Sequence, residues 1–146
     1  MNRLDRRRFL RQTGLAAGSL ALGGIHFACA TMGAPMKQVE LQGSTITFDT
    51  AIPELQNAGD AVALDSMFLE YPILLIREEN GSFVALSSGC THLGCTVRKE
   101  PALLRCPCHD SAFTLKGEVL NGPAEKPLRE YAVRMKGNTA EIEVNL

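Results

Sequence analysis

The sequence predicts an all-β domain made of short strands, with one insertion of loops at residues 88–124. Three observations predict this fold class. Short apolar segments recur along the chain, glycine-containing turns separate them, and no long segment has the periodicity of an amphipathic helix. The chain has 146 residues, of which 45% are hydrophobic and none is tryptophan. These values are typical of one domain with a small aliphatic core.

The first predicted strand spans residues 45–48, where polar and apolar residues alternate. Two apolar runs follow, at 73–77 and 82–86, and Asn80-Gly81 between them is a strong hairpin signal. A helical turn is expected only within 53–64. The remaining predicted strands are short and bounded by turn residues, and they lie at 118–120, 131–135 and 140–144.

The first 30 residues have the layout of an export signal: a basic start, an uncharged apolar stretch, and small residues. Arg6-Arg7-Arg8-Phe9-Leu10-Arg11 resembles the twin-arginine pattern R-R-x-F-L-K. That pattern predicts export in a folded state to the periplasm of a bacterium. Residues 28–30 fit a cleavage site, and Cys29 is a candidate for lipidation. Retention as a membrane anchor is the third alternative.

Residues 31–146 are acidic. Five of the 15 Lys and Arg residues and one of the 16 Asp and Glu residues lie in the first 30, which leaves 10 basic and 15 acidic side chains. This negative charge argues against a nucleic-acid partner. It suits the approach of a partner with a basic surface, such as a basic cytochrome. Gly33 and Pro35 predict a linker over 31–38, and residues 39–146 are then the folded domain.

Two short stretches hold four of the five cysteines and two of the three histidines. They read C-x-H-x13-C-x2-H, formed by Cys90, His92, Cys106 and His109. Two thiolates and two imidazoles suit a 2Fe-2S cluster with the cysteines on one iron and the histidines on the other. A structural zinc site usually brings its ligands in a different spacing. A plain disulfide scaffold would leave both histidines unexplained.

This arrangement resembles the Rieske iron–sulfur proteins of the disulfide-containing, high-potential branch. The resemblance implies three stacked antiparallel sheets, with a cluster held at one tip by an insertion of two loops. It also implies that Cys90 and Cys106 bind the inner iron and that His92 and His109 bind the outer, redox-active iron. Finally, it implies a disulfide between Cys95 and Cys108 that joins the two loops. Such a disulfide fits an oxidising compartment.

The same resemblance points to residues that tune the cluster. In the family pattern C-P-C-H-G-S-x-Y, the serine hydroxyl bonds a bridging sulfide and the tyrosine hydroxyl bonds a cysteine sulfur. Ser111 is present here, but Phe113 replaces the tyrosine and Asp110 replaces the glycine. We therefore expect a lower potential than in typical ubiquinol-oxidising subunits. Gly122 and Pro123 resemble the loop that covers the cluster from a third side.

The resemblance implies one-electron transfer as the iron–sulfur subunit of a quinol–cytochrome c reductase-like complex. An alternative is the small subunit of a periplasmic molybdenum oxidase such as arsenite oxidase. A third hypothesis is the ferredoxin component of a Rieske dioxygenase, and a fourth is a structural zinc-binding module. The expected partners are a cytochrome, a copper protein or a molybdoenzyme large subunit, and a quinol where the N-terminus attaches to a membrane. No catalytic site is expected in this chain itself.

Overall fold

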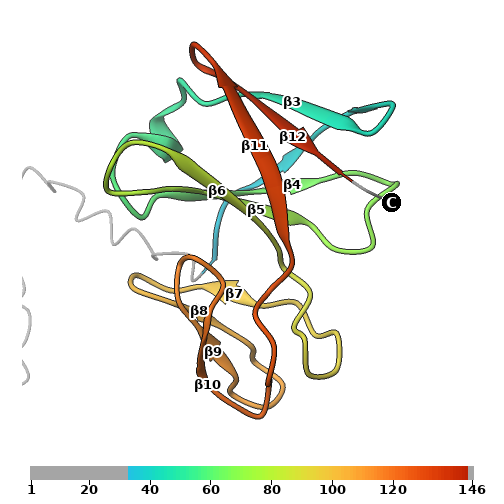
Figure 1. Cartoon of the computed structure of the whole chain (residues 1–146), viewed down its shortest axis with the longest axis vertical. Helices are drawn as coiled ribbons and strands as arrows, with labels where there is room; N and C mark the ends of the chain where they lie inside the picture. The colour runs from blue at the N-terminus through green and yellow to red at the C-terminus, as the bar shows by residue number, and fades with distance from the viewer. Residues whose placement is uncertain (1–32, 145–146) are drawn as a thin grey trace, which may run out of the picture.

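The computed structural model describes residues 33–144, so the predicted signal at 1–30 lies outside the described residues. The described chain forms two sheets, as predicted for an all-β domain (Figure 1). An eight-stranded sheet has the order β1-β4-β5-β6-β11-β12-β3-β2, and a four-stranded sheet has the order β10-β9-β8-β7. In the described part of the chain, no helix is long and apolar enough to cross a membrane.

The larger sheet curls, so that β3, β11 and β12 lie over β4, β5 and β6 (Figure 1). β11 connects the two halves, because it pairs with β6 near its start and with β12 along its length. The expected arrangement of three stacked antiparallel sheets is thus realised as one curled sheet and one small sheet. The strands of the larger sheet are β1 (Met36–Gln38), β2 (Leu41–Gln42), β3 (Thr45–Asp49), β4 (Ala61–Asp65), β5 (Ile73–Arg77), β6 (Phe83–Ser87), β11 (Glu130–Lys136) and β12 (Thr139–Glu143).

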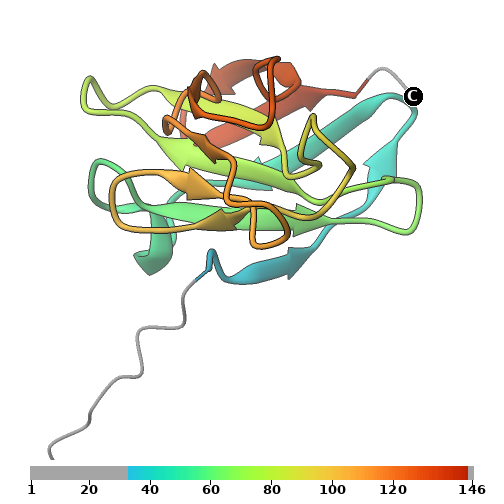
Figure 2. The same ribbon diagram turned by 90° about the horizontal axis from the view of Figure 1, so that it is seen from below.

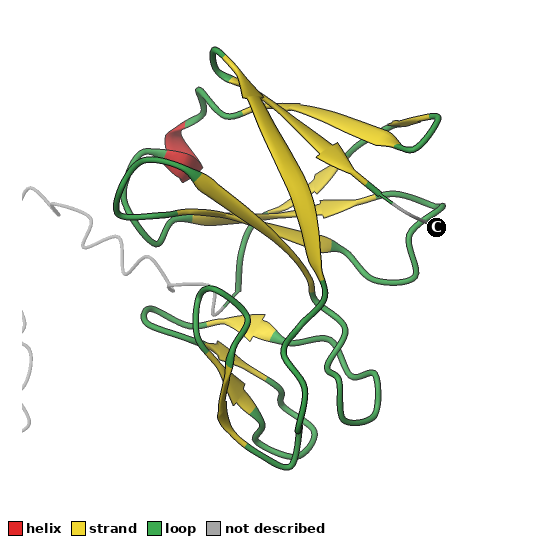
Figure 3. Ribbon diagram, viewed as in Figure 1, coloured by secondary structure: helices red, strands yellow, loops and turns green. Residues whose placement is uncertain are grey.

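The smaller sheet lies wholly within the predicted insertion and packs below the larger one (Figures 1 and 2). All its pairings are antiparallel. Its strands are only two or three residues long, and most of this end of the molecule consists of loops (Figure 3). The four strands are β7 (Arg98–Lys99), β8 (Leu104–Arg105), β9 (Ala112–Phe113) and β10 (Val119–Asn121).

Strands β4, β5 and β6 form a middle layer that is buried on both faces. Alternate residues of β5 show this: Leu74 and Ile76 pack toward the smaller sheet, whereas Ile73 and Leu75 pack toward the other half of the larger sheet. Two-sided burial requires apolar residues at successive positions. This explains why residues 73–77 are a continuous apolar run rather than an alternating one.

Two parts of the chain differ from the prediction. Residues 53–64 were expected to hold at most a helical turn, and the structure has a short 3-10 helix at Pro53–Leu55 followed by β4. β4 was missed because Ala61 and Ala63 have low strand propensity and pack there against another layer. The predicted linker also contains β1, which pairs with β4 in the only parallel register of the described chain.

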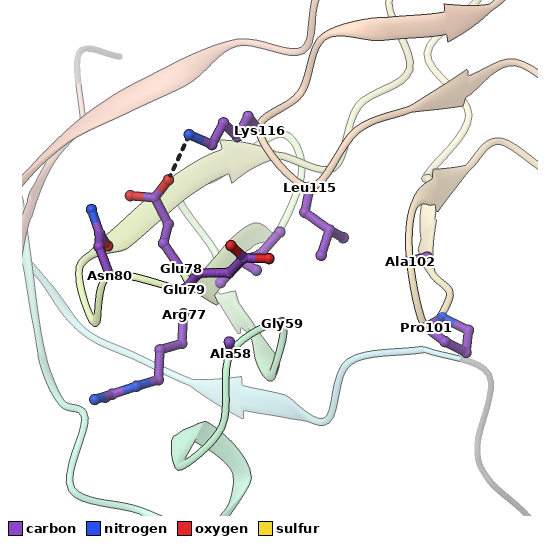
Figure 4. Close-up of a pocket in the computed structure, with 11 residues that line it drawn as sticks. Ala58, Gly59, Arg77, Glu78, Glu79, Asn80, Pro101, Ala102, Leu115 and Lys116 are labelled. Atoms are coloured by element: carbon purple, nitrogen blue, oxygen red, sulfur yellow. Dashed lines mark ion pairs between the residues drawn. The ribbon is translucent and has the colours of Figure 1, made fainter.

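The turn between β5 and β6 contacts the small sheet through an ion pair. Lys116 Nζ lies 3.3 Å from Glu78 Oε1, at the edge of a pocket of about 630 Å3 between the two sheets (Figure 4). The Ser82 hydroxyl also donates a hydrogen bond to Glu78. The Ser82 hydrogen bond and then Lys116 lower the pKa of the Glu78 carboxyl. Glu78 therefore stabilises the folded chain only while it is ionised.

Glu78→Gln is expected to lower the free energy of unfolding near neutral pH by about 0.5–1 kcal/mol, since the pair is partly exposed. Because the folded-state pKa is depressed, the contribution of Glu78 is full above the pKa of an unfolded glutamate. It is lost as the pH falls through the lower folded-state pKa. Urea unfolding at neutral and at acidic pH measures this difference. The neighbouring Glu79→Gln is the control, and an equal loss in both variants would contradict the prediction.

Candidate metal centre

The first predicted ligand loop, residues 90–95, is a closed turn. The Gly94 N–H donates to the Cys90 carbonyl at 2.9 Å, and the Cys90 N–H donates to the Cys95 carbonyl, also at 2.9 Å. Gly94 has a φ of 78°, in the left-handed region that favours glycine. These bonds bring Cys90 and Cys95 to the two ends of one tight loop.

The second loop, residues 106–111, has the same backbone pattern. The Asp110 N–H donates to the Cys106 carbonyl at 3.1 Å, and the Cys106 N–H donates to the Ser111 carbonyl at 2.8 Å. Asp110 has a φ of 58° and is the only described residue other than glycine with a positive φ. It therefore takes the place that Gly94 has in the first loop. Aspartate is among the few side chains that tolerate this conformation.

The predicted disulfide is present between Cys95 and Cys108, so each loop is covalently held by the other. The Cys106 sulfur lies within 4.8 Å of both disulfide sulfurs. These three sulfurs do not form a metal site, because two of them are bonded to each other and have no thiolate to offer. The disulfide is instead a cross-link beside the two remaining cysteines.

Cys90 and Cys106 are free and buried. Burial is the main cause that raises the pKa of the Cys106 thiol, and the neighbouring Cys90 thiol raises it further. A metal cation bound beside the buried Cys106 thiol would stabilise its thiolate form. The pair thus offers two sulfur ligands on one side of the centre.

The two histidines lie side by side, with ring centroids 4.9 Å apart and ring planes at 87°. His109 is exposed and His92 is half-buried. His92 Nδ1 is buried and has no hydrogen-bond partner among the described residues. A buried ring nitrogen without a partner is costly unless something binds it. The donor set of two thiols and two imidazoles, with one imidazole nitrogen unsatisfied, fits a 2Fe-2S cluster.

A third segment packs against both loops. The Ala124 N–H donates to Ser111 Oγ at 3.0 Å, and Thr91 Oγ1 donates to the Lys126 carbonyl at 2.6 Å. The predicted covering residues, Gly122 and Pro123, directly precede Ala124 and are joined by a cis peptide bond. The segment at 122–126 therefore connects to each loop by one hydrogen bond.

Two of the predicted tuning positions lie in the interior beside the second loop. Ser111 and Phe113 are both fully buried, and Phe113 packs in the same apolar cluster as Cys90 and Cys106. Since Ser111 Oγ accepts its bond from Ala124, the hydroxyl hydrogen of Ser111 is free to donate. The sequence did not indicate one further neighbour, Tyr71, which lies against the first loop from the side of the larger sheet.

Comparisons with known proteins point to the same type of iron–sulfur centre. The family model of the Rieske [2Fe-2S] domain matches residues 48–132. The cytochrome b6-f complex iron-sulfur subunit 2 of Trichormus variabilis is 30% identical over 134 residues, covering 85% of this chain and 75% of the relative.

A second relative is the cytochrome b6-f complex iron-sulfur subunit of Chlorobaculum tepidum. It is 33% identical over 73 residues, and the match covers 49% of this chain but only 40% of the relative's length. A solved structure titled as a hyperthermophilic respiratory Complex III is similar, with a TM-score of 0.55 and 26% identity. That likeness covers 68% of this chain and 75% of the other.

Proposed function

This chain belongs to the Rieske [2Fe-2S] domain family and binds a 2Fe-2S cluster, and we propose that it transfers single electrons as the iron–sulfur subunit of a quinol–cytochrome c reductase-like complex. The observation that carries the proposal is the donor set on the two matched loops. Two buried free thiols and two adjacent imidazoles remain after the disulfide has used the other two cysteines of the loops.

We assign Cys90 and Cys106 to one iron, and His92 and His109 to the other. Bound in this way, the cluster supplies a one-electron redox couple between a neutral and a singly negative state. The two cysteines belong to the apolar cluster between the two sheets, so they would hold the iron–sulfur cluster from its buried side. His109 is exposed, so an iron bound there would be accessible to a redox partner.

The disulfide supports a location outside the cytoplasm, because cytosolic thiols are kept reduced. Together with the twin-arginine pattern at Arg6-Arg7, it supports the periplasm or the periplasmic face of the membrane of a bacterium. The relatives named above support a cytochrome and a quinol as partners. The disulfide also argues against the ferredoxin of a cytoplasmic dioxygenase.

Electron paramagnetic resonance of the reduced full-length protein tests the proposal. We expect the signal of a histidine-ligated 2Fe-2S cluster, with two irons and two acid-labile sulfides for each chain. His109→Ala is expected to abolish that signal, since one ligand is lost. Zinc in place of iron, or a signal unchanged by His109→Ala, would contradict the assignment. Copurification with a large molybdopterin protein, instead of a cytochrome complex, would favour the molybdenum oxidase alternative.

A further inference from the structure

We propose that Tyr71 is a positioning residue for the metal centre: its ring holds the first ligand loop against the larger sheet and keeps solvent from Cys90. The inference rests on the proposed function, because it takes Cys90 as a ligand of the cluster. Tyr71 is not part of either ligand loop. It lies in the connection between β4 and β5, two residues before β5 begins.

The ring lies directly on the backbone of two glycines. A Cβ at Gly89 would come within 2.6, 2.8 and 2.9 Å of three ring carbons of Tyr71, and a Cβ at Gly94 within 2.6 Å of its hydroxyl oxygen. Such approaches are possible only because glycine has no side chain. Gly89 and Gly94 bracket Cys90 and His92, so the ring spans the base of the loop that carries both proposed ligands.

The larger sheet fixes Tyr71 from behind. The Ser88 N–H donates to the Pro72 carbonyl at 2.9 Å, and Ile73 pairs with Ser87 in the register of β5 and β6. The backbone that follows Tyr71 is thus hydrogen-bonded to the backbone that precedes Gly89. Tyr71 is therefore held in place by the backbone just before β5. Its ring packs on Gly89, at the start of the loop that follows β6. The ring can therefore hold the first ligand loop in a fixed position relative to the larger sheet.

A pocket of about 430 Å3 lies beside the Tyr71 ring and shows where solvent approaches the first ligand loop. Tyr71, Phe68 and Cys90 all line this pocket, whereas Cys106 does not. Cys90 itself is only 4% exposed. The pocket therefore brings solvent close to one of the two proposed cysteine ligands. Gly89 and Gly94 line it too, and Tyr71 packs against both glycines, so the ring occupies space beside Cys90 that solvent would otherwise fill. Removal of the ring is therefore expected to enlarge the pocket beside Cys90.

Two measurable effects follow for the loaded protein. A loop without its support releases the cluster faster, because residues that orient ligands contribute about 10–100-fold to metal affinity. Water near Cys90 also stabilises the more charged, reduced state of the cluster, so the midpoint potential rises. The ring, and not the hydroxyl, makes the contact with Gly89. The hydroxyl contacts Gly94, so Tyr71→Phe keeps the Gly89 contact, loses the Gly94 contact and is expected to lie between the wild type and Tyr71→Ala.

The test compares four full-length proteins: wild type, Tyr71→Ala, Tyr71→Phe and Phe68→Ala. Phe68 is a matched control, because it is also aromatic, lines the same pocket and is 59% exposed. The readouts are the half-life of visible circular dichroism in the presence of a chelator, and the midpoint potential. After chelation, iodoacetamide labelling of Cys90 and Cys106 is compared by mass spectrometry.

We expect Tyr71→Ala to shorten the half-life about tenfold, to raise the midpoint and to speed labelling of Cys90 relative to Cys106. Wild-type values in Tyr71→Ala, or equal effects in Phe68→Ala, would overturn the inference. If Tyr71→Ala is insoluble, Tyr71→Leu provides the same comparison with more apolar bulk retained. A wild-type protein with no cluster signal would instead refute the proposed function, so the two failures are distinguishable.

Discussion

Replacement of both disulfide cysteines, Cys95→Ser together with Cys108→Ser, is expected to shorten the lifetime of the bound cluster at least about tenfold. The disulfide joins the two ligand loops across a sequence separation of 13 residues. A cross-link over a loop of this length stabilises a folded chain by about 3 kcal/mol in the chain-entropy description. Apart from the disulfide, the segment at 122–126 joins the two loops by one hydrogen bond to each, and the small sheet beside them has strands of only two or three residues.

Chelator-driven loss of visible circular dichroism at constant temperature measures this lifetime. Cys29→Ser is the matched control, because Cys29 is the fifth cysteine and is predicted to lie in the export signal. The control should keep the wild-type lifetime. If the double variant did so as well, the disulfide would have no part in holding the cluster.

The 2Fe-2S cluster and the disulfide could be predicted from the sequence because both depend on short local motifs. Each ligand pair, such as Cys90 and His92, lies within four residues, and the two motifs bracket a short spacer. The matched hydrogen bonding of the two loops could not be predicted from spacing. Gly94 and Asp110 have different side chains, and only their positive φ values show that they are equivalent.

The hairpins could also be predicted, since Asn80-Gly81 and the closing turn before β12 carry their own signals. β4 could not, because its strand character comes from burial between two layers and not from its residues. The contact of Tyr71 with Gly89 is similar. Seventeen residues lie between the two positions in the sequence, and the pairing of β5 with β6 brings them together.

The remaining prediction concerns Phe113→Tyr, which is expected to raise the midpoint potential by about 60 mV, the value for a tenfold, one-electron change. Phe113 is fully buried in the apolar cluster that contains Cys90 and Cys106. A hydroxyl added there costs about 1–3 kcal/mol if it finds no partner. A nearby cysteine sulfur is the acceptor that the family pattern implies. A hydrogen bond to sulfur stabilises the added electron, and the reduced state becomes more favourable.

Ser111→Ala is the companion variant, and its shift has the opposite sign. Ser111 Oγ already accepts a hydrogen bond from Ala124, so its own hydrogen is the one available to the cluster. Loss of that donor is expected to lower the midpoint by a similar amount, about 60 mV. Redox titration followed by visible circular dichroism measures both shifts on the same scale. A midpoint that stays constant or falls in Phe113→Tyr would show that the missing hydroxyl does not set the potential of this centre.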